Sequence, residues 1–165
     1  MAETIAFVLR NLPVFLFVAA LVFAWLSRSG GSLADRLLAW ILLLPIGVTG
    51  LWAAVFHLFF PEIAAADIGW EPSPFQFEVG MADLAMGATA CVAFWRSLDF
   101  KAAAVTVNAI FLLGDAIGHV EQMVATGDFA PGNAGVPFIG DLAFPALALI
   151  LLIVVQRSGS APRIS

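Results

Sequence analysis

The sequence predicts an all-α fold, a polytopic membrane bundle of five transmembrane helices that forms one domain over residues 1–165. Hydrophobic residues make up 62% of the chain and the mean hydropathy is +1.00, whereas soluble domains are about 45–50% apolar. The apolar residues also cluster into long runs separated by short stretches rich in glycine and proline. Both observations exclude an ordinary water-soluble domain and predict that a lipid bilayer surrounds the chain.

Five segments approach the length of a membrane span. A helix that crosses a hydrocarbon core about 30 Å thick needs roughly 20 mostly apolar residues. We expect spans near residues 4–27, 34–60, 75–96, 101–125 and 138–156. Three of the connections, SRSGGS, PEIAAADIGWEPSP and TGDFAPGNAGVPF, carry the glycines and prolines that end helices.

The first apolar run could also be a secretory signal, because residues 12–26 form a short hydrophobic core. A signal peptide begins with a positively charged region. Here Glu3 precedes the run and no lysine accompanies it. We therefore expect a retained first span.

The positive residues predict the orientation, since short cytoplasmic loops collect lysine and arginine. Six of the seven positive residues flank the first and third connections or lie in the C-terminal tail. These are Arg28, Arg36, Arg96, Lys101, Arg157 and Arg163. The second and fourth connections contain neither residue type, and Arg10 lies inside the first span. The pattern predicts an outer N-terminus and a cytoplasmic C-terminus.

The charge balance excludes some function classes. The chain has 7 Lys or Arg against 12 Asp or Glu, a formal net charge of −5, so it has no basic surface to attract DNA or RNA. The single cysteine, Cys91, rules out an intrachain disulfide and is expected to be a packing residue. No HExxH, CxxC or P-loop pattern is present.

Polar side chains from all five predicted spans share the outer half of the bilayer. At 1.5 Å of rise per residue they lie about 5 to 15 Å below the outer surface. This polar layer consists of Arg10, His57, Glu78, Asp83, Asp115, His119 and Asp141. The inner half has almost nothing polar apart from residues at the interface, so the polar layer is the predicted functional site.

Helical phase groups part of this layer on the fourth span. At 100° per residue, Asn108, Asp115, His119 and Gln122 fall within an arc of about 60°, whereas Glu121 points nearly opposite. On the third span, Glu78 and Asp83 lie about 140° apart, so one of them could instead pair with Arg10.

An ionised group buried in the membrane costs at least about 2.5 kcal/mol, so the excess carboxylates need neutralisation. Two histidines with carboxylates from separate helices suit a divalent metal such as zinc or iron. The predicted metal ligands are His57, Glu78, Asp115 and His119. Asp83 or Glu121 is the candidate general base of a metal-dependent membrane enzyme that acts on a small molecule.

Other interpretations remain open. Protons or cations could neutralise the same carboxylates in a transport or binding protein. His57 and His119 could be axial ligands of a haem. A small-residue face formed by Gly80 and Gly87, with Ala82, Ala85 and Ala88, could pack against neighbouring helices, in a homo-oligomer or as an accessory subunit of a larger membrane complex. The last outer loop has the turn chemistry of a tight lid over the polar layer, in which Asn133 is able to take a positive φ, and a simple connector fits it equally well.

The segments SPFQFEVGMADLAMG, GDAIGHVEQM and DFAPGNAG occur in that order between Trp70 and Asp141. In these motifs the chain resembles a family of small bacterial inner-membrane proteins catalogued as a domain of unknown function. The resemblance implies a helical protein of the bacterial plasma membrane. It supplies no activity and no catalytic residue that could be transferred to this chain.

Overall fold

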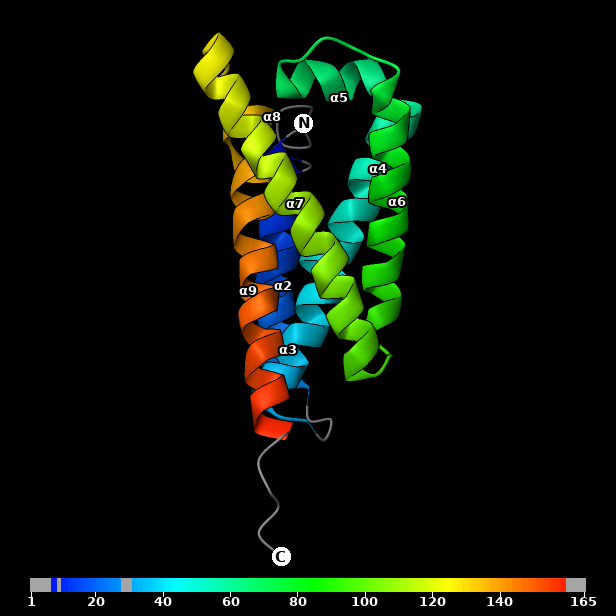
Figure 1. The fold of residues 1–165 in the computed structure, drawn as a ribbon, viewed down its shortest axis with the longest axis vertical. Helices are drawn as coiled ribbons and strands as arrows, with labels where there is room; N and C mark the ends of the chain where they lie inside the picture. Colours follow the sequence, from blue (N-terminus) through cyan, green and yellow to red (C-terminus); the bar gives the residue numbers. More distant parts are fainter. Residues whose placement is uncertain (1–6, 9, 28–30, 160–165) are drawn as a thin grey trace, which may run out of the picture.

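The structure, a computed structural model, describes residues 7–8, 10–27 and 31–159. Over these residues the chain is helical, as predicted, and its long helices run side by side along the long axis (Figure 1). They are α2 (Leu12–Leu26), the rod of α3 (Leu33–Ile41), η1 (Leu42–Val48) and α4 (Thr49–Phe59), then α6 (Phe75–Ala93), α7 (Leu98–Thr126) and α9 (Val136–Gly159). The short helices α5 (Pro61–Ile68) and α8 (Pro131–Ala134) lie at one end.

Three helical stretches are long and apolar enough to cross a membrane: Leu33–Phe59, Leu98–Thr126 and Pro131–Ser158. This finding fits a membrane protein. The helix α2 is apolar but has only 15 residues, and the 19-residue α6 carries Glu78 and Asp83. Part of the predicted first span, 4–27, lies outside the described residues. The other spans agree with the observed helices to within a few residues.

The continuous rod of α3, η1 and α4 changes from an α-helix to a π-helix around Pro45. Proline lacks a backbone N–H and its ring crowds the carbonyl four residues earlier. The residues around Pro45 form the π-helical segment η1, which continues directly into α4. A π-turn absorbs one extra residue without breaking the rod, so it rotates the residues of α4, including His57, relative to those of α3.

Glycines set the distance between this rod and α6. A Cβ at Gly87 would lie 2.7 Å from the backbone N of Leu51 and 2.9 Å from the carbonyl O of Gly47. A Cβ at Gly50 would lie 3.1 Å from the Cα of Gly87. The two backbones therefore nearly touch, as small residues allow in membrane helices. Of the small-residue face predicted on α6, Gly80 and Gly87 are buried, whereas Ala85 and Ala88 are exposed.

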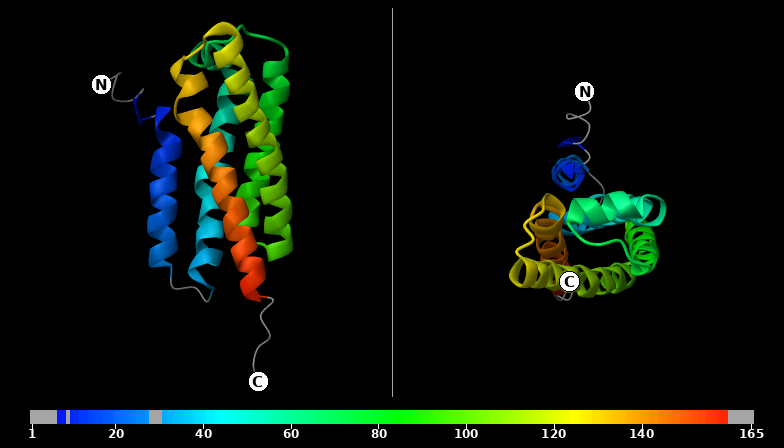
Figure 2. Two further views of the ribbon diagram at one scale, coloured as in Figure 1. Left: turned by 60° about the vertical axis from the view of Figure 1, so that its left-hand side comes forward. Right: turned by 90° about the horizontal axis from the view of Figure 1, so that it is seen from above.

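The two ends of the bundle differ in what they bury. At the end that holds the start of α3 and the end of α9, the core consists of apolar side chains such as Leu38, Ile41, Val105, Leu152 and Val155. From the end that holds α5 and α8, the rod of α3 to α4 and the helices α6, α7 and α9 form a ring, and α2 packs outside it (Figure 2). The side chains of the predicted polar layer lie toward the end that holds α5 and α8.

Candidate functional site

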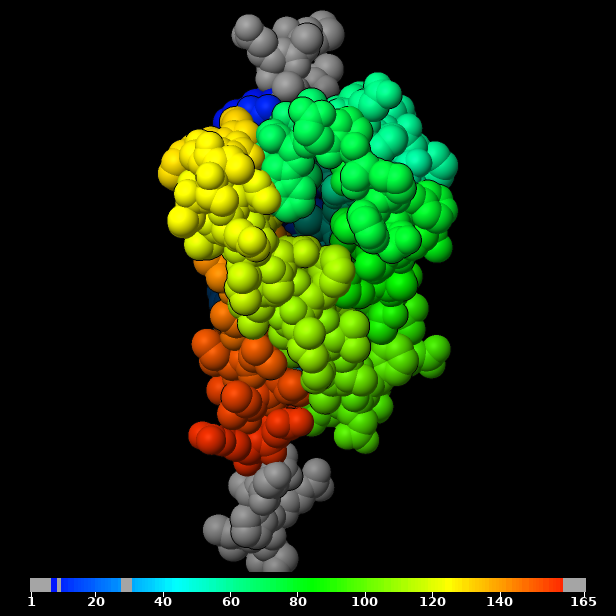
Figure 3. Space-filling view, turned by 45° about the horizontal axis from the view of Figure 1, so that its top comes forward, coloured from blue at the N-terminus to red at the C-terminus, as the bar shows by residue number. Residues whose placement is uncertain are grey.

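A cavity of about 260 Å³ lies inside the ring at the end covered by α5 and α8. The space-filling view shows this end hollowed between the green of α5 and α6 and the yellow-green of α7 (Figure 3). Six of the seven residues of the polar layer line the cavity. They are Arg10, His57, Asp83, Asp115, His119 and Asp141. Side chains distant in sequence thus meet in one space.

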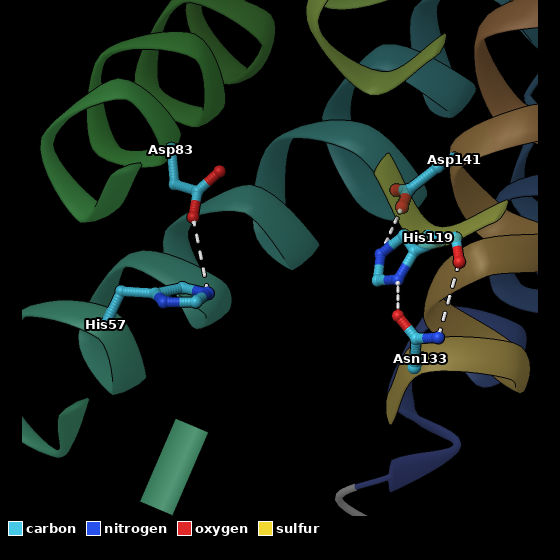
Figure 4. Close-up of polar contacts among 5 residues, drawn as sticks. All are labelled: His57, Asp83, His119, Asn133 and Asp141. Atoms are coloured by element: carbon cyan, nitrogen blue, oxygen red, sulfur yellow. Dashed lines mark hydrogen bonds and ion pairs between the residues drawn. The ribbon is translucent and has the colours of Figure 1, made fainter. Parts of the chain in front are cut away.

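His119 on α7 is held on both ring nitrogens (Figure 4). Its Nδ1 lies 2.7 Å from Oδ1 of Asn133, and its Nε2 lies 3.5 Å from Oδ2 of Asp141. The His119 ring also packs against the rings of Trp70 and Phe138, at centroid distances of 5.9 Å and 6.2 Å. The ring is therefore fixed in position and orientation.

Asn133 decides which nitrogen of His119 carries a proton. Its Nδ2 donates to the carbonyl O of Asp128 at 2.8 Å and to that of His119 at 3.4 Å. The amide is thereby oriented with Oδ1 as the acceptor toward Nδ1 of His119, so Nδ1 donates. In a neutral ring Nε2 is then an acceptor facing the Asp141 carboxylate. A proton on either His119 Nε2 or Asp141 makes this contact favourable.

A second histidine and aspartate face each other across the cavity from the first pair (Figure 4). Nε2 of His57 on α4 lies 4.0 Å from Oδ2 of Asp83 on α6. Nδ1 of His57 is buried and makes no hydrogen bond of acceptable geometry within the described part of the chain. Gln76 is close enough to interact with the ring, although its Nε2 donates to the carbonyl of Pro61 at 3.2 Å. This pair is looser than the first.

Asp115 on α7 connects the two pairs electrostatically. It lies close enough to Asp141 and His119 to interact with both, and Asp83 in turn interacts with Asp115 and Asp141. Three carboxyl groups therefore share one largely buried space. Trp52 and Phe56 on α4, whose ring centroids are 4.7 Å apart, form an aromatic part of the wall.

The positive charge at this site is already partnered. Among the described residues that line the cavity, Arg10 is the single arginine or lysine. Its Nη2 donates to Oδ1 of Asp67 on α5 at 3.0 Å, and both side chains are partly exposed. The pairing of Arg10 with Glu78 or Asp83, considered from the sequence, is therefore not the one observed. The backbone of Asp67 on α5 also lies close to α8. A Cβ at Gly132 on α8 would lie 2.5 Å from the carbonyl O of Asp67.

The family model described as "Family of unknown function (DUF6790)" matches residues 10–161. The chain belongs to this family. The match spans the three motifs that carried the resemblance and confirms membership of a family of unknown function. No curated protein and no solved structure matches the DUF6790 chain.

The structure brings together some of the predicted site residues of this DUF6790 protein and separates others. His57, Asp115 and His119, predicted as metal ligands, and Asp83, predicted as a base, line the cavity. Glu78 is exposed on α6, and Glu121 is exposed on α7. Neither side chain borders the cavity. Within the described ranges, no three His, Cys, Asp or Glu side chains are grouped closely enough to hold a metal ion. The zinc or iron site therefore stays a prediction.

Two residues of the site were absent from the predicted ligand set. The depth of Asp141 along its predicted span places it in the polar layer, and the sequence assigns it no role there. Asn133 could have adopted a positive φ in the last outer loop, but no described non-glycine residue has one. Asn133 lies instead in the short helix α8 and is 0% exposed. A buried asparagine signals a hydrogen-bonding duty, but the sequence did not reveal its burial.

Proposed function

We propose that this DUF6790 protein is an integral membrane protein that binds a small organic cation in its polar cavity. One observation carries the proposal. Asp83, Asp115 and Asp141 face a single cavity, and Arg10, which also lines it, is already paired with Asp67. Buried carboxylates need a positive partner or a proton, and a bound cation supplies that partner.

The size and walls of the cavity favour an organic cation over a bare ion. A water molecule occupies about 30 Å³ in the liquid, and small-molecule pockets begin at about 300 Å³. A cavity of about 260 Å³ therefore suits an amine of a few carbon atoms. Trp52 and Phe56 in the wall offer aromatic faces, which attract ammonium groups by cation–π interactions.

The membrane placement belongs to the same proposal. Five helices span a bacterial inner membrane, with the N-terminus outside and the C-terminus in the cytoplasm. This orientation follows from the distribution of arginine and lysine in the sequence. The cavity then opens toward the outer face, because it lies at the end of the bundle that holds α5 and α8.

Titration calorimetry on the protein in lipid nanodiscs tests this function, with butylammonium as the probe and butanol as its uncharged counterpart. We expect saturable binding of butylammonium and none of butanol. Asp83→Asn and Asp141→Asn should each weaken binding at least about tenfold, since each removes a charge from a poorly solvated site. Asp99→Asn, an exposed change in the first turn of α7, is the matched control. Equal affinity in all four proteins, or no saturable binding, overturns the proposal.

A divalent metal is the second candidate. The pairing of His119 with Asp141 and Asn133 favours it, because metal-binding histidines are commonly oriented by a second hydrogen bond. The described side chains would have to move for a third ligand to join. Mass spectrometry of purified protein distinguishes the candidates. About one equivalent of zinc or iron that is lost in His57→Ala and in His119→Ala supports the metal, and metal-free protein that binds butylammonium supports the organic cation.

A further inference from the structure

A second, wholly apolar cavity adjoins the polar one. It has a volume of about 230 Å³, lies between α2 and α9, and is lined by apolar side chains and one glycine, among them Val14, Phe17 and Ala143. We call it the apolar groove. Val136, Gly140 and Phe144 border both the apolar groove and the polar cavity. The two spaces therefore meet along α9 at these three residues.

Phe144 lines both spaces. Its ring packs against Phe17 of α2 at a centroid distance of 5.6 Å. A Cβ at Gly140 would lie 3.0 Å from Cε2 of Phe144, so the glycine lets this ring lie close against α9. Asp141, next in the chain to Gly140, lines the polar cavity. A residue that lines the apolar groove, Gly140, is thus adjacent in α9 to a carboxylate of the polar cavity.

The apolar groove faces the surroundings of the bundle. Val14 is 42% exposed and Ile139 is 59% exposed, and both line it. The helix α2 stands outside the ring of the other helices (Figure 2). In a bilayer such a surface contacts acyl chains. The groove therefore opens sideways, toward lipid, while the polar cavity opens at the end of the bundle.

We propose that the ligand is a single-chain amphiphile that enters from the membrane, with its ammonium head in the polar cavity and its alkyl chain in the apolar groove. This inference rests on the proposed function and names its ligand class. The carboxylates supply charge complementarity to the head, and Gly140 and Phe144 line both the polar cavity and the apolar groove, so the two sites meet along α9.

Photolabelling in phosphatidylglycerol nanodiscs tests the inference, because these lipids carry no ammonium group. The probe is dodecylammonium with a diazirine at the end of its chain, and the matching dodecanol probe is its uncharged control. We expect adducts on residues 12–26 and 136–147, with at least about fivefold less labelling by the dodecanol probe. Excess butylammonium should suppress the labelling, since it competes for the head site.

Two variants of one helix sharpen the test. Ala143→Phe fills the apolar groove and should reduce labelling there at least about fivefold. Ala146→Phe places the same side chain at an exposed position of α9 outside the groove, and should leave labelling unchanged. The unfolding temperature of each variant is measured alongside to test that it is folded. Adducts spread evenly over the lipid-facing helices, or equal labelling by the dodecanol probe, overturn the inference. Butylammonium binding that persists in that case leaves the proposed function standing.

Discussion

The side chain of Asn133 holds the Nδ1 side of the His119 ring at 2.7 Å while its amide nitrogen donates to the carbonyl of Asp128 at 2.8 Å. One fully buried amide thus ties the short helix α8 to the long helix α7. It also directs the Nε2 side of the ring to Asp141 on α9. The cover of the cavity and its chemistry therefore depend on the same residue.

Replacing Asn133 by Ala should lower the stability of the protein. It removes the partners of His119 Nδ1 and of the Asp128 carbonyl, and an unsatisfied buried polar group costs about 1–3 kcal/mol. We expect a clearly lower unfolding temperature in detergent, followed by circular dichroism. Asn11→Ala is the control, since the Asn11 side chain bonds only the carbonyl of Phe7 in a less buried setting. An equal effect of both changes would argue against this role of Asn133.

Gly87→Ala should destabilise the bundle more than any other glycine substitution on α6. Its Cβ would meet backbone atoms of the neighbouring rod at 2.7 Å and 2.9 Å, which cannot move independently of their helix. Overpacking of this kind costs about 1–3 kcal/mol. At Gly80 the nearest atoms belong to the Leu58 side chain, at 2.8 Å and 2.9 Å, so Gly80→Ala should be milder.

The matched control for both changes is Gly114→Ala on α7, where a Cβ would meet nothing within 4 Å. Alanine in a helix interior is favoured over glycine by roughly 0.5–1 kcal/mol. Its unfolding temperature should therefore stay the same or rise. The order Gly87→Ala, Gly80→Ala, Gly114→Ala from least to most stable is the expected result, and any other order contradicts the packing argument.

The long apolar runs were sufficient to predict the helices, because a membrane span is set by length and composition alone. The polar layer was predictable for the same reason, since depth along a span follows from the rise per residue. The structure adds which side chains of that layer turn inward. That choice depends on how each helix is rotated about its axis, and rotation is set by packing against its neighbours.

Glu78 and Asp83 show that depth alone does not tell which side chain of α6 faces the cavity. The positions of the glycines on α6 could have told it. Gly80, Asp83 and Gly87 fall on one side of α6 at 100° per residue, whereas Glu78 lies about 160° from Gly80. The glycines mark the side that approaches α4, so Asp83 shares the packed side and Glu78 does not. Asn133, the partner of His119 Nδ1, was beyond this reasoning, because it comes from a four-residue helix in a connection.

Charge changes at the rim should alter cation binding in opposite directions. Arg10 and Asp67 form a partly exposed pair that borders the cavity, so its contribution to stability is small. Arg10→Gln removes a repelling charge and should tighten butylammonium binding, whereas Asp67→Asn should weaken it. About two- to fivefold is expected for partly screened charges. High salt should reduce both effects, and changes of equal sign would exclude an electrostatic role for the rim.

The proposed orientation predicts which positions a membrane-impermeant maleimide reaches in intact bacterial cells. In a Cys91→Ala background, Ser73→Cys introduces a thiol in the connection before α6, and Ser97→Cys introduces one between α6 and α7. Both serines are exposed, and they lie at opposite ends of α6, Ser73 before it and Ser97 after it. If positive residues mark the cytoplasmic side, Ser73→Cys should be labelled at once and Ser97→Cys only after the membrane is permeabilised. The reverse pattern would place the cavity on the cytoplasmic side, and labelling of both positions would mean that α6 does not span the membrane.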